Sequence, residues 1–199
     1  KNLSNTINNS QYVDSIGSGS TVVVVHVTKD KLICINCGDS RAILITKKNN
    51  NEIIALSRDH KPELPEEKAR VEANGGRIDK IYGMGPFRVW FKNEDYPGLA
   101  MSRSIGDQLA HKVGVSDIPE IKEFMISEVS PLALVVASDG VWEFMSNDDV
   151  KNIVMNNAYQ KDANACSKNI VEKARETWKR TGYAIDDITC VVSFFNLYL

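Results

Sequence analysis

The sequence has little that would place the protein in a membrane, outside the cell or on nucleic acid. None of its apolar runs approaches the ~20 residues that cross a bilayer, and no signal peptide is visible at its start. The formal net charge is −2, which gives no electrostatic reason to expect nucleic acid as a partner. We therefore expect an ordinary intracellular globular protein, cytoplasmic or nuclear. Because the chain begins at Lys1 and not at Met, we expect it to be part of a longer protein.

Cysteine is scarce, and the four that occur are Cys34, Cys37, Cys166 and Cys190. Cys34 and Cys37 have the spacing of a metal-binding pair, but no second pair or His follows at the distance that zinc sites require. The cysteines lie in apolar strand-like or helical segments, so we expect buried free thiols in a reducing compartment. None has an Arg at the spacing of a phosphate-binding loop, which argues against a cysteinyl-phosphate intermediate.

Phosphate-binding loops of the common kind are also absent. Gly17–Ser20 form a Gly/Ser loop, but the Lys-Ser/Thr that makes a P-loop specific does not follow. We therefore interpret this loop as the start of a strand. Residues 1–16 are rich in Asn and Ser and predict a polar tail, a loop or a truncated element.

What is present is a regular pattern of strands and helices. Short apolar runs within residues 21–56 are separated by polar turns, and this spacing predicts an antiparallel meander. A helix is predicted over Pro65–Asn74, where Pro and two glutamates form the first turn. Two more are predicted over residues 147–158 and 163–179, where apolar residues recur at helical spacing, and Ser146 is a typical N-cap for the first of these.

Residues 76–98 have no clean period and carry many aromatic side chains. A loop of this length inside a compact domain is usually functional or mobile. Two interpretations stay open: a flap that covers a site, or a small satellite core. After this loop, Arg103 and Asp107 stand four residues apart, and we expect them to form a structural pair.

Acidic residues stand at the ends of predicted strands. The apolar run 132–137 stops at Ser138-Asp139-Gly140, Asp39 also follows a strand, and Asp186-Asp187 precede a terminal strand over residues 188–195. Taken alone, an Asp-Gly pair is typical of a turn. The repetition of acids at strand ends makes a functional interpretation worth testing.

Antiparallel pairing would bring these acids together. If the terminal strand runs antiparallel to residues 132–138, Asp139 and Asp186 reach the same edge of a sheet. Two like charges ~4 Å apart cost about 4 kcal/mol at an effective dielectric of ~20, so their convergence would require a cation. Oxygen ligands suit Mg²⁺ or Mn²⁺ better than zinc. The acids therefore predict a divalent metal site, where Gly140 would allow a close approach of backbone or ligand.

Seven sequence blocks stand out along the chain: GSGST (17–21), NCGDSRA (36–42), LSRDHKP (56–62), EANGGRI (72–78), PGLAMSRSIGD (97–107), VVASDGVWE (135–143) and DDITCVV (186–192). They occur in the order found in protein phosphatase 2C-type, metal-dependent Ser/Thr phosphatases, and the chain resembles that family from Gly17 to Phe195. RVWFKNEDYPGLAMSRSIGD is most similar to the plant-type branch. The resemblance implies a phosphatase domain over residues 17–199. Its fold would be α+β, with two antiparallel β-sheets packed as a sandwich flanked by helices in α-β-β-α layers.

The resemblance also implies roles for the acids. Asp139 and Asp186 match the aspartates that hold the first catalytic metal, and Asp39 matches a ligand of a third, weaker metal position. Glu143 stands where that third position often has Asp. Asp187 stands where the family usually has Asn, so it could compete with Asp186 as the ligand.

One part of the family pattern is missing. The opening Asp-Gly-His-Gly-Gly motif and the upstream Arg that grips the substrate phosphate do not occur, and none of His26, His60 and His111 lies in such a context. We therefore expect the N-terminal part of the domain, with its catalytic residues, to be missing from this chain, and we expect the chain alone to have little activity.

The implied activity is hydrolysis of phosphoserine and phosphothreonine in proteins by a water that Mg²⁺ or Mn²⁺ activates, with two or three ions in the complete domain. Residues 76–98 correspond to the family's flap, so Phe87, Arg88 and Trp90 would face the substrate. The alternative is a catalytically silent phosphatase-like module that binds or regulates partners. The presence of Asp139 and Asp186 favours the enzyme.

Overall fold

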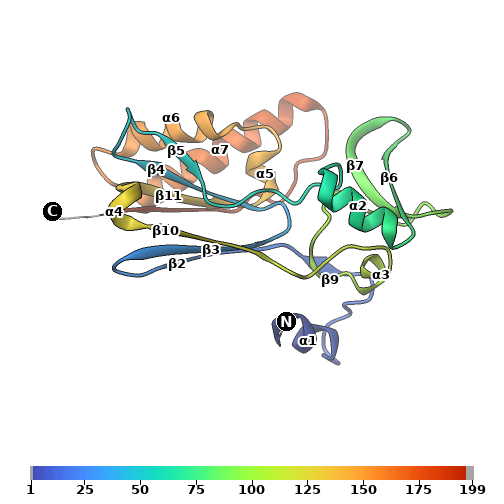
Figure 1. The fold of residues 1–199 in the computed structure, drawn as a ribbon. Coiled ribbons are helices and arrows are strands. Elements are labelled where there is room, and N and C mark those ends of the chain that lie inside the picture. The colour runs from blue at the N-terminus through green and yellow to red at the C-terminus, as the bar shows by residue number, and fades with distance from the viewer. Residues whose placement is uncertain (1, 196–199) are drawn as a thin grey trace. The chain divides into compact units, whose positions relative to one another are not determined.

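A computed structural model describes residues 2–195, so the last four residues of the predicted 17–199 domain lie outside the described range. Figure 1 shows the course of the chain. The helices are α1 (Asn2–Asn8), α2 (Pro65–Ala73), α3 (Gln108–His111), α4 (Ile126–Val129), α5 (Asp139–Trp142), α6 (Asn147–Asn157) and α7 (Ala163–Thr181). The strands are β1 (Gly19–Ser20), β2 (Val22–Val27), β3 (Lys31–Cys37), β4 (Arg41–Thr46), β5 (Ile53–Ala55), β6 (Gly76–Ile81), β7 (Met84–Phe91), β8 (Pro97–Leu99), β9 (Ile105–Gly106), β10 (Glu120–Met125), β11 (Pro131–Ala137) and β12 (Cys190–Phe194).

The chain forms two compact units. The first unit comprises residues 1–22, 36–39 and 59–120. The second unit comprises residues 23–35, 40–58 and 121–199.

Two β-sheets packed through apolar side chains form the centre of the second unit. One sheet has the strand order β12-β11-β4-β5 and the other β10-β3-β2. Ala42 and Leu44 of β4 join a buried cluster with Leu32 of β3, whereas Ile43 and Ile45 join a second cluster with the helices. The period of two in a strand thus lets β4 serve both cores. The predicted α+β fold with antiparallel sheets and helices is confirmed.

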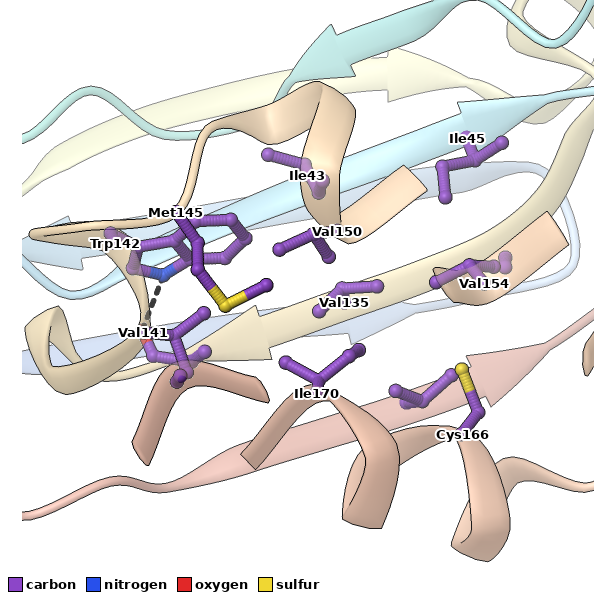
Figure 2. Packing of buried hydrophobic residues seen from close by; sticks show 14 residues of the cluster. Ile43, Ile45, Val135, Val141, Trp142, Met145, Val150, Val154, Cys166 and Ile170 are labelled. Atoms are coloured by element: carbon purple, nitrogen blue, oxygen red, sulfur yellow. Dashed lines mark hydrogen bonds between the residues drawn. The ribbon is translucent and has the colours of Figure 1, made fainter. Parts of the chain in front are cut away.

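Helices α6 and α7 cover the outer face of the β12-β11-β4-β5 sheet (Figure 2). Val150 of α6 and Ile170 of α7 are fully buried there. Ser146 caps α6 in a capping box with Asp149, which confirms the predicted N-cap. Both helices begin where predicted and end within two residues of the predicted limits. Within residues 2–195, no helix has both the length and the apolar character needed to cross a bilayer.

In the first unit, a sheet of order β6-β7-β8 packs on α2 and α3 through a small apolar cluster. The prediction of a long loop over residues 76–98 is wrong, because most of this stretch lies in the three strands. The register of the ladder shifts between Asp79 and Ile81 and between Val89 and Trp90. Such irregularities break the alternation of buried and exposed residues, so the sequence shows no strand period.

The N-terminal segment contains a short helix. Asn2–Asn8 form α1, and the chain that follows is attached to α3. Gln108 donates from Nε2 to Ser15 Oγ at 2.7 Å, and its backbone N–H donates to Ser15 O at 3.0 Å. Asn and Ser favour caps and turns over helix interiors, so a segment rich in them does not predict a helix.

The four cysteines are free thiols, as predicted, and all but Cys190 are buried. Burial raises the pKa of Cys34, Cys37 and Cys166 to about 11 and that of Cys190 to about 12. Thiols with such pKa values are protonated at neutral pH, and the thiol form is a poor nucleophile.

Replacing Ile170 with Ala should lower the free energy of unfolding by ~2–5 kcal/mol, because it leaves a cavity between α7 and the sheet. Urea unfolding followed by circular dichroism measures the loss. The matched control is Val191→Ala on β12, where the side chain is 60% exposed and the change should be small. Equal losses in the two variants would contradict this packing.

Candidate metal centre

The end of β11 and the start of β12 are joined by Ser138. The two strands pair antiparallel, with Ala137 opposite Cys190, which is the pairing that the predicted convergence of the acids requires. Beyond this pair, the Ser138 N–H donates to Thr189 O at 3.0 Å. Ser138 Oγ donates to Asp187 O at 3.1 Å and accepts from the Thr189 N–H at 3.0 Å. These bonds hold the segment that carries Asp187 beside the segment that continues into Asp139.

Gly140 lies in close contact with the same segment. A Cβ atom built on Gly140 would collide with Asp187 O and would lie 3.1 Å from the Ile188 side chain. Because a backbone oxygen cannot easily move aside, only glycine fits here without a shift of the chain. Gly140 therefore allows α5 to begin directly against the residues that precede β12.

The acids at this edge differ in exposure. Asp139 is the first residue of α5 and is half-buried, whereas Glu143, Asp186 and Asp187 are exposed. Asp186 Oδ1 accepts the Asp187 N–H at 2.7 Å, which orients the Asp186 carboxylate toward its own backbone. The Glu143 N–H donates to Asp139 O at 2.8 Å, so Glu143 directly follows the turn that Asp139 begins.

Carboxylate oxygens are the ligands that Mg²⁺ and Mn²⁺ prefer, so Asp139 and Asp186 fit a hard divalent ion. These two aspartates come from the segments that follow β11 and precede β12, which are in contact through Ser138 and Gly140. In the part of the chain that the structure describes, no group of three or more His, Cys, Asp or Glu side chains is arranged to hold a metal. Asp139 and Asp186 therefore stand on adjoining segments without forming an assembled cluster, and their role as metal ligands stays a prediction.

Asp39 belongs to the first unit. Its side chain is 2% exposed and its Oδ2 lies 2.7 Å from Lys61 Nζ, so an ammonium group compensates this buried carboxylate. The preceding Gly38 has a φ of +113°, and its N–H donates to Nδ1 of the fully buried His60 at 3.0 Å. His60 and Lys61 of the HKP block therefore fix the loop that carries Asp39.

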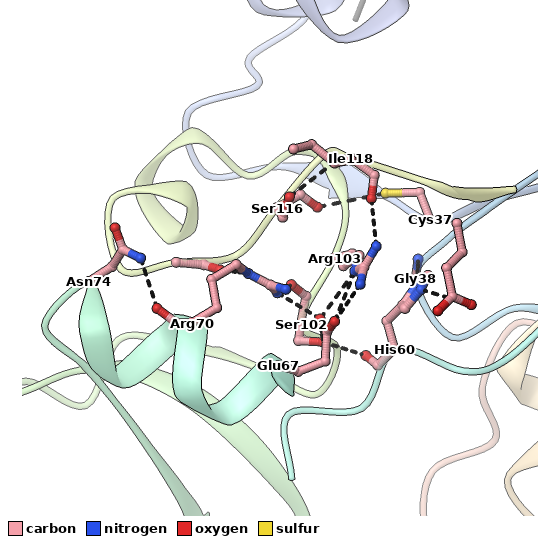
Figure 3. Close-up of polar contacts among 12 residues, drawn as sticks. Cys37, Gly38, His60, Glu67, Arg70, Asn74, Ser102, Arg103, Ser116 and Ile118 are labelled. Carbon is pink, nitrogen blue, oxygen red and sulfur yellow. Dashed lines mark hydrogen bonds and ion pairs between the residues drawn. The ribbon is translucent and has the colours of Figure 1, made fainter. Parts of the chain in front are cut away.

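Glu67 of α2 is a buried charge that was not predicted from the sequence. Figure 3 shows Arg70, Ser102 and Arg103 meeting its carboxylate. Arg70 Nη2 lies 2.6 Å from Oε2, Ser102 Oγ donates to Oε2 at 2.5 Å, and Arg103 Nη2 lies 2.5 Å from Oε1. The predicted pairing of Arg103 with Asp107 is wrong, because Arg103 turns to Glu67 instead. One sequence signal could have indicated the burial of Glu67. It stands four residues before Val71, which is also buried, and residues at this spacing are neighbours on a helix surface.

Burial by itself would raise the pKa of Glu67. The hydrogen bonds from Arg70, Arg103 and Ser102 outweigh it and hold that pKa well below its usual range. Glu67 is therefore ionised at neutral pH and joins α2 to the SRSIGD segment by charge-assisted bonds.

Trp90 of β7 is almost fully buried. The residue is 9% exposed, its Nε1–H donates to Asp79 O at 3.1 Å, and the Arg77 guanidinium lies over its ring at 5.3 Å from the centroid. Phe87 and Arg88 are half-buried on the same strand, and Arg88 Nη1 donates to Gly98 O at 2.6 Å. These contacts favour a satellite core for Trp90. The role of the three residues in substrate binding stays a prediction.

Comparison with known proteins decides the family. The model of the family described as Protein phosphatase 2C matches residues 1–180. The chain belongs to this family. The resemblance seen in the seven sequence blocks is thereby confirmed.

Two curated relatives from plants are similar to most of this chain. The chain is 36% identical over 189 residues to "Probable protein phosphatase 2C 34" of Arabidopsis thaliana, covering 92% of this chain and 52% of the relative. It is 37% identical over 192 residues to "Probable protein phosphatase 2C 12" of Oryza sativa subsp. japonica, covering 92% and 48%. The chain spans about half the length of these relatives.

Two solved structures have a fold similar to that of this chain. A serine-threonine phosphatase 2C from Toxoplasma gondii superposes with a TM-score of 0.85 at 22% identity, covering 98% of this chain and 64% of that chain. A C. elegans sex determining protein superposes with a TM-score of 0.70 at 27% identity, covering 88% and 40%.

Replacing Glu67 with Gln should lower the free energy of unfolding by ~3–5 kcal/mol at pH 7, because two guanidinium groups lose their buried counter-charge. The folded pKa of Glu67 lies below the unfolded value of ~4.3, so the wild-type advantage is present above about pH 5 and is lost as the pH falls. Urea unfolding at pH 7 and pH 3.5 measures both effects. The control is Glu72→Gln, an exposed acid on the same helix. A difference between wild type and Glu67→Gln that is constant with pH would contradict this account.

Proposed function

We propose that this chain is part of a metal-dependent phosphatase that hydrolyses phosphoserine and phosphothreonine in proteins. The observation that carries the proposal is the contact between the end of β11 and the start of β12, which supplies Asp139 and Asp186 from adjoining segments. Family membership supports the reaction class, and the oxygen-only ligands support Mg²⁺ or Mn²⁺ as the cofactor.

Asp139 and Asp186 would hold the metal, with the exposed Asp187 next in the chain as a competing ligand. When bound, a divalent ion lowers the pKa of a water molecule and offsets charge on phosphoryl oxygens. Ser138 keeps the two segments together, and Gly140 leaves room for their contact.

Asp39 of the first unit and Glu143 of the second unit are each proposed to bind a metal ion weakly. Asp39 already has the Lys61 ammonium at 2.7 Å, so a metal ion would have to displace that group. Glu143 is exposed and longer by one methylene than the Asp that the family often has there. We therefore expect metal binding at each of these two residues to be weak.

The hairpin of β6 and β7 is the proposed substrate flap. Tyr82 at its tip is 92% exposed and Met84 is 69% exposed, so apolar surface is available to a protein substrate. Phe87 and Arg88 lie farther along β7, and the buried Trp90 would anchor the hairpin.

Turnover of p-nitrophenyl phosphate and of phosphopeptides with Mn²⁺ tests the proposal. We expect a longer form of the protein, extended upstream of Lys1, to be active, and Asp139→Asn to abolish its metal-dependent rate. The 199-residue chain should be slower by ~10²–10⁴-fold or more, because it lacks the motif that supplies the general-acid His in the family. The exposed Asp148→Asn on α6 is the matched control and should leave the rate unchanged.

Equal metal-dependent rates for the 199-residue chain and the longer form would contradict the proposed division of the active site. No metal-dependent rate in either form would contradict the enzyme and support a silent phosphatase-like module.

A further inference from the structure

We propose that Trp178 of α7 is a positioning residue that holds the Asp139 turn in place for metal binding. This inference rests on the proposed function, because it assigns a partner to the turn that carries the expected ligand. The contact that carries it is a buried hydrogen bond from Trp178 Nε1 to Gly140 O at 2.7 Å.

The turn that carries Asp139 is short and has little stability of its own. α5 comprises only Asp139–Trp142, and a single helical turn is unstable unless other parts of the protein hold it. Its orientation, and with it the direction of the Asp139 carboxylate, must be set by tertiary contacts.

Two indole N–H groups supply such contacts on either side of Ser138-Asp139. Trp142 Nε1 donates to Ala137 O at 2.9 Å, at the end of β11. Trp178 Nε1 donates to Gly140 O, in the turn itself. Both indoles are buried, at 6% and 8% exposure, so water does not readily replace either donor.

Gly140 is also restrained by its contact with the segment before β12. There, a Cβ on Gly140 would collide with Asp187 O. The Gly140 peptide therefore has the Asp187 backbone and the Trp178 indole as neighbours. These two contacts together set the spacing between Asp139 and the Asp186 segment.

The Trp178 indole is itself fixed by aromatic packing. Its ring meets Phe144 edge-on, with centroids 4.6 Å apart and planes at 86°. Phe144 stacks in turn on Tyr183, at 6.4 Å and 12°. A change at Phe144 alters this packing but keeps the Trp178 N–H, so packing and hydrogen bonding can be tested separately.

The experiment measures Mn²⁺ binding by calorimetry in wild type, Trp178→Phe and Phe144→Leu, at a temperature where circular dichroism shows each to be folded. Phe keeps an aromatic ring at position 178 but removes the donor. We expect Trp178→Phe to bind Mn²⁺ about tenfold more weakly, because a buried carbonyl loses its partner and the turn shifts. Phe144→Leu should bind within about twofold of wild type. Hydrogen exchange at residues 141–143 should be faster in Trp178→Phe only.

Wild-type binding by the folded Trp178→Phe variant would overturn the inference, as would an equal loss in Phe144→Leu. If Trp178→Phe does not fold, the wild-type protein still decides: the ¹⁵N-indole resonance of Trp178 should shift on titration with Mg²⁺ and should not shift in Asp139→Asn. An indole resonance that does not respond would overturn the inference.

The proposed metal site and the proposed role of Trp178 can fail separately. If wild type shows no binding that depends on Asp139, the metal site fails and the role of Trp178 fails with it. If wild type and Asp139→Asn differ but Trp178→Phe matches wild type, only the role of Trp178 is wrong.

Discussion

Ser138 forms hydrogen bonds at the point where β11 ends and the approach to β12 begins, and the proposed metal centre depends on them. Its backbone and hydroxyl bond to Thr189 and Asp187 across the two segments. Pairing of the strands fixes the register up to Ala137 and Cys190, and Ser138 extends that order beyond the last pair. Without this extension, the two acidic segments would be held by no side-chain bond at this point, and repulsion between like charges would favour their separation.

The acidic residues discussed above differ in burial and in how their charge is compensated. Asp39 and Glu67 are buried, and each has a cationic side chain within hydrogen-bond distance. Such pairs avoid the large cost of an isolated buried charge, and they lock loops to helices. Asp186 and Asp187 remain exposed, where water compensates their charge until a cation binds. Buried pairs are suited to structure and exposed carboxylates to ligand exchange, which matches the roles proposed for Glu67 and for Asp186.

Much of the fold follows from local sequence signals. The strand period in residues 32–46 and 132–137, the capping box at Ser146 and the Pro65 start of α2 all reflect interactions within a few residues, so the sequence predicts them well. The strands within residues 76–98 are harder to predict, because two register shifts interrupt the strand period. The Glu67 cluster was missed because Arg70, Ser102 and Arg103 are brought together by tertiary structure, and a glutamate in a first helical turn is normally exposed. The pairing of β11 with β12 could be anticipated, whereas the indole bond to Gly140 could not.

The central claim is that Asp139 and Asp186 act on one divalent ion, and a double-mutant cycle tests it most directly. Calorimetry with Mn²⁺ would compare wild type, Asp139→Asn, Asp186→Asn and the double variant. If both carboxylates hold the same ion, each single change should remove most of the affinity, and the double change should add little further loss. Independent losses that sum in the double variant, or an Asp186→Asn variant that binds like wild type, would contradict the account.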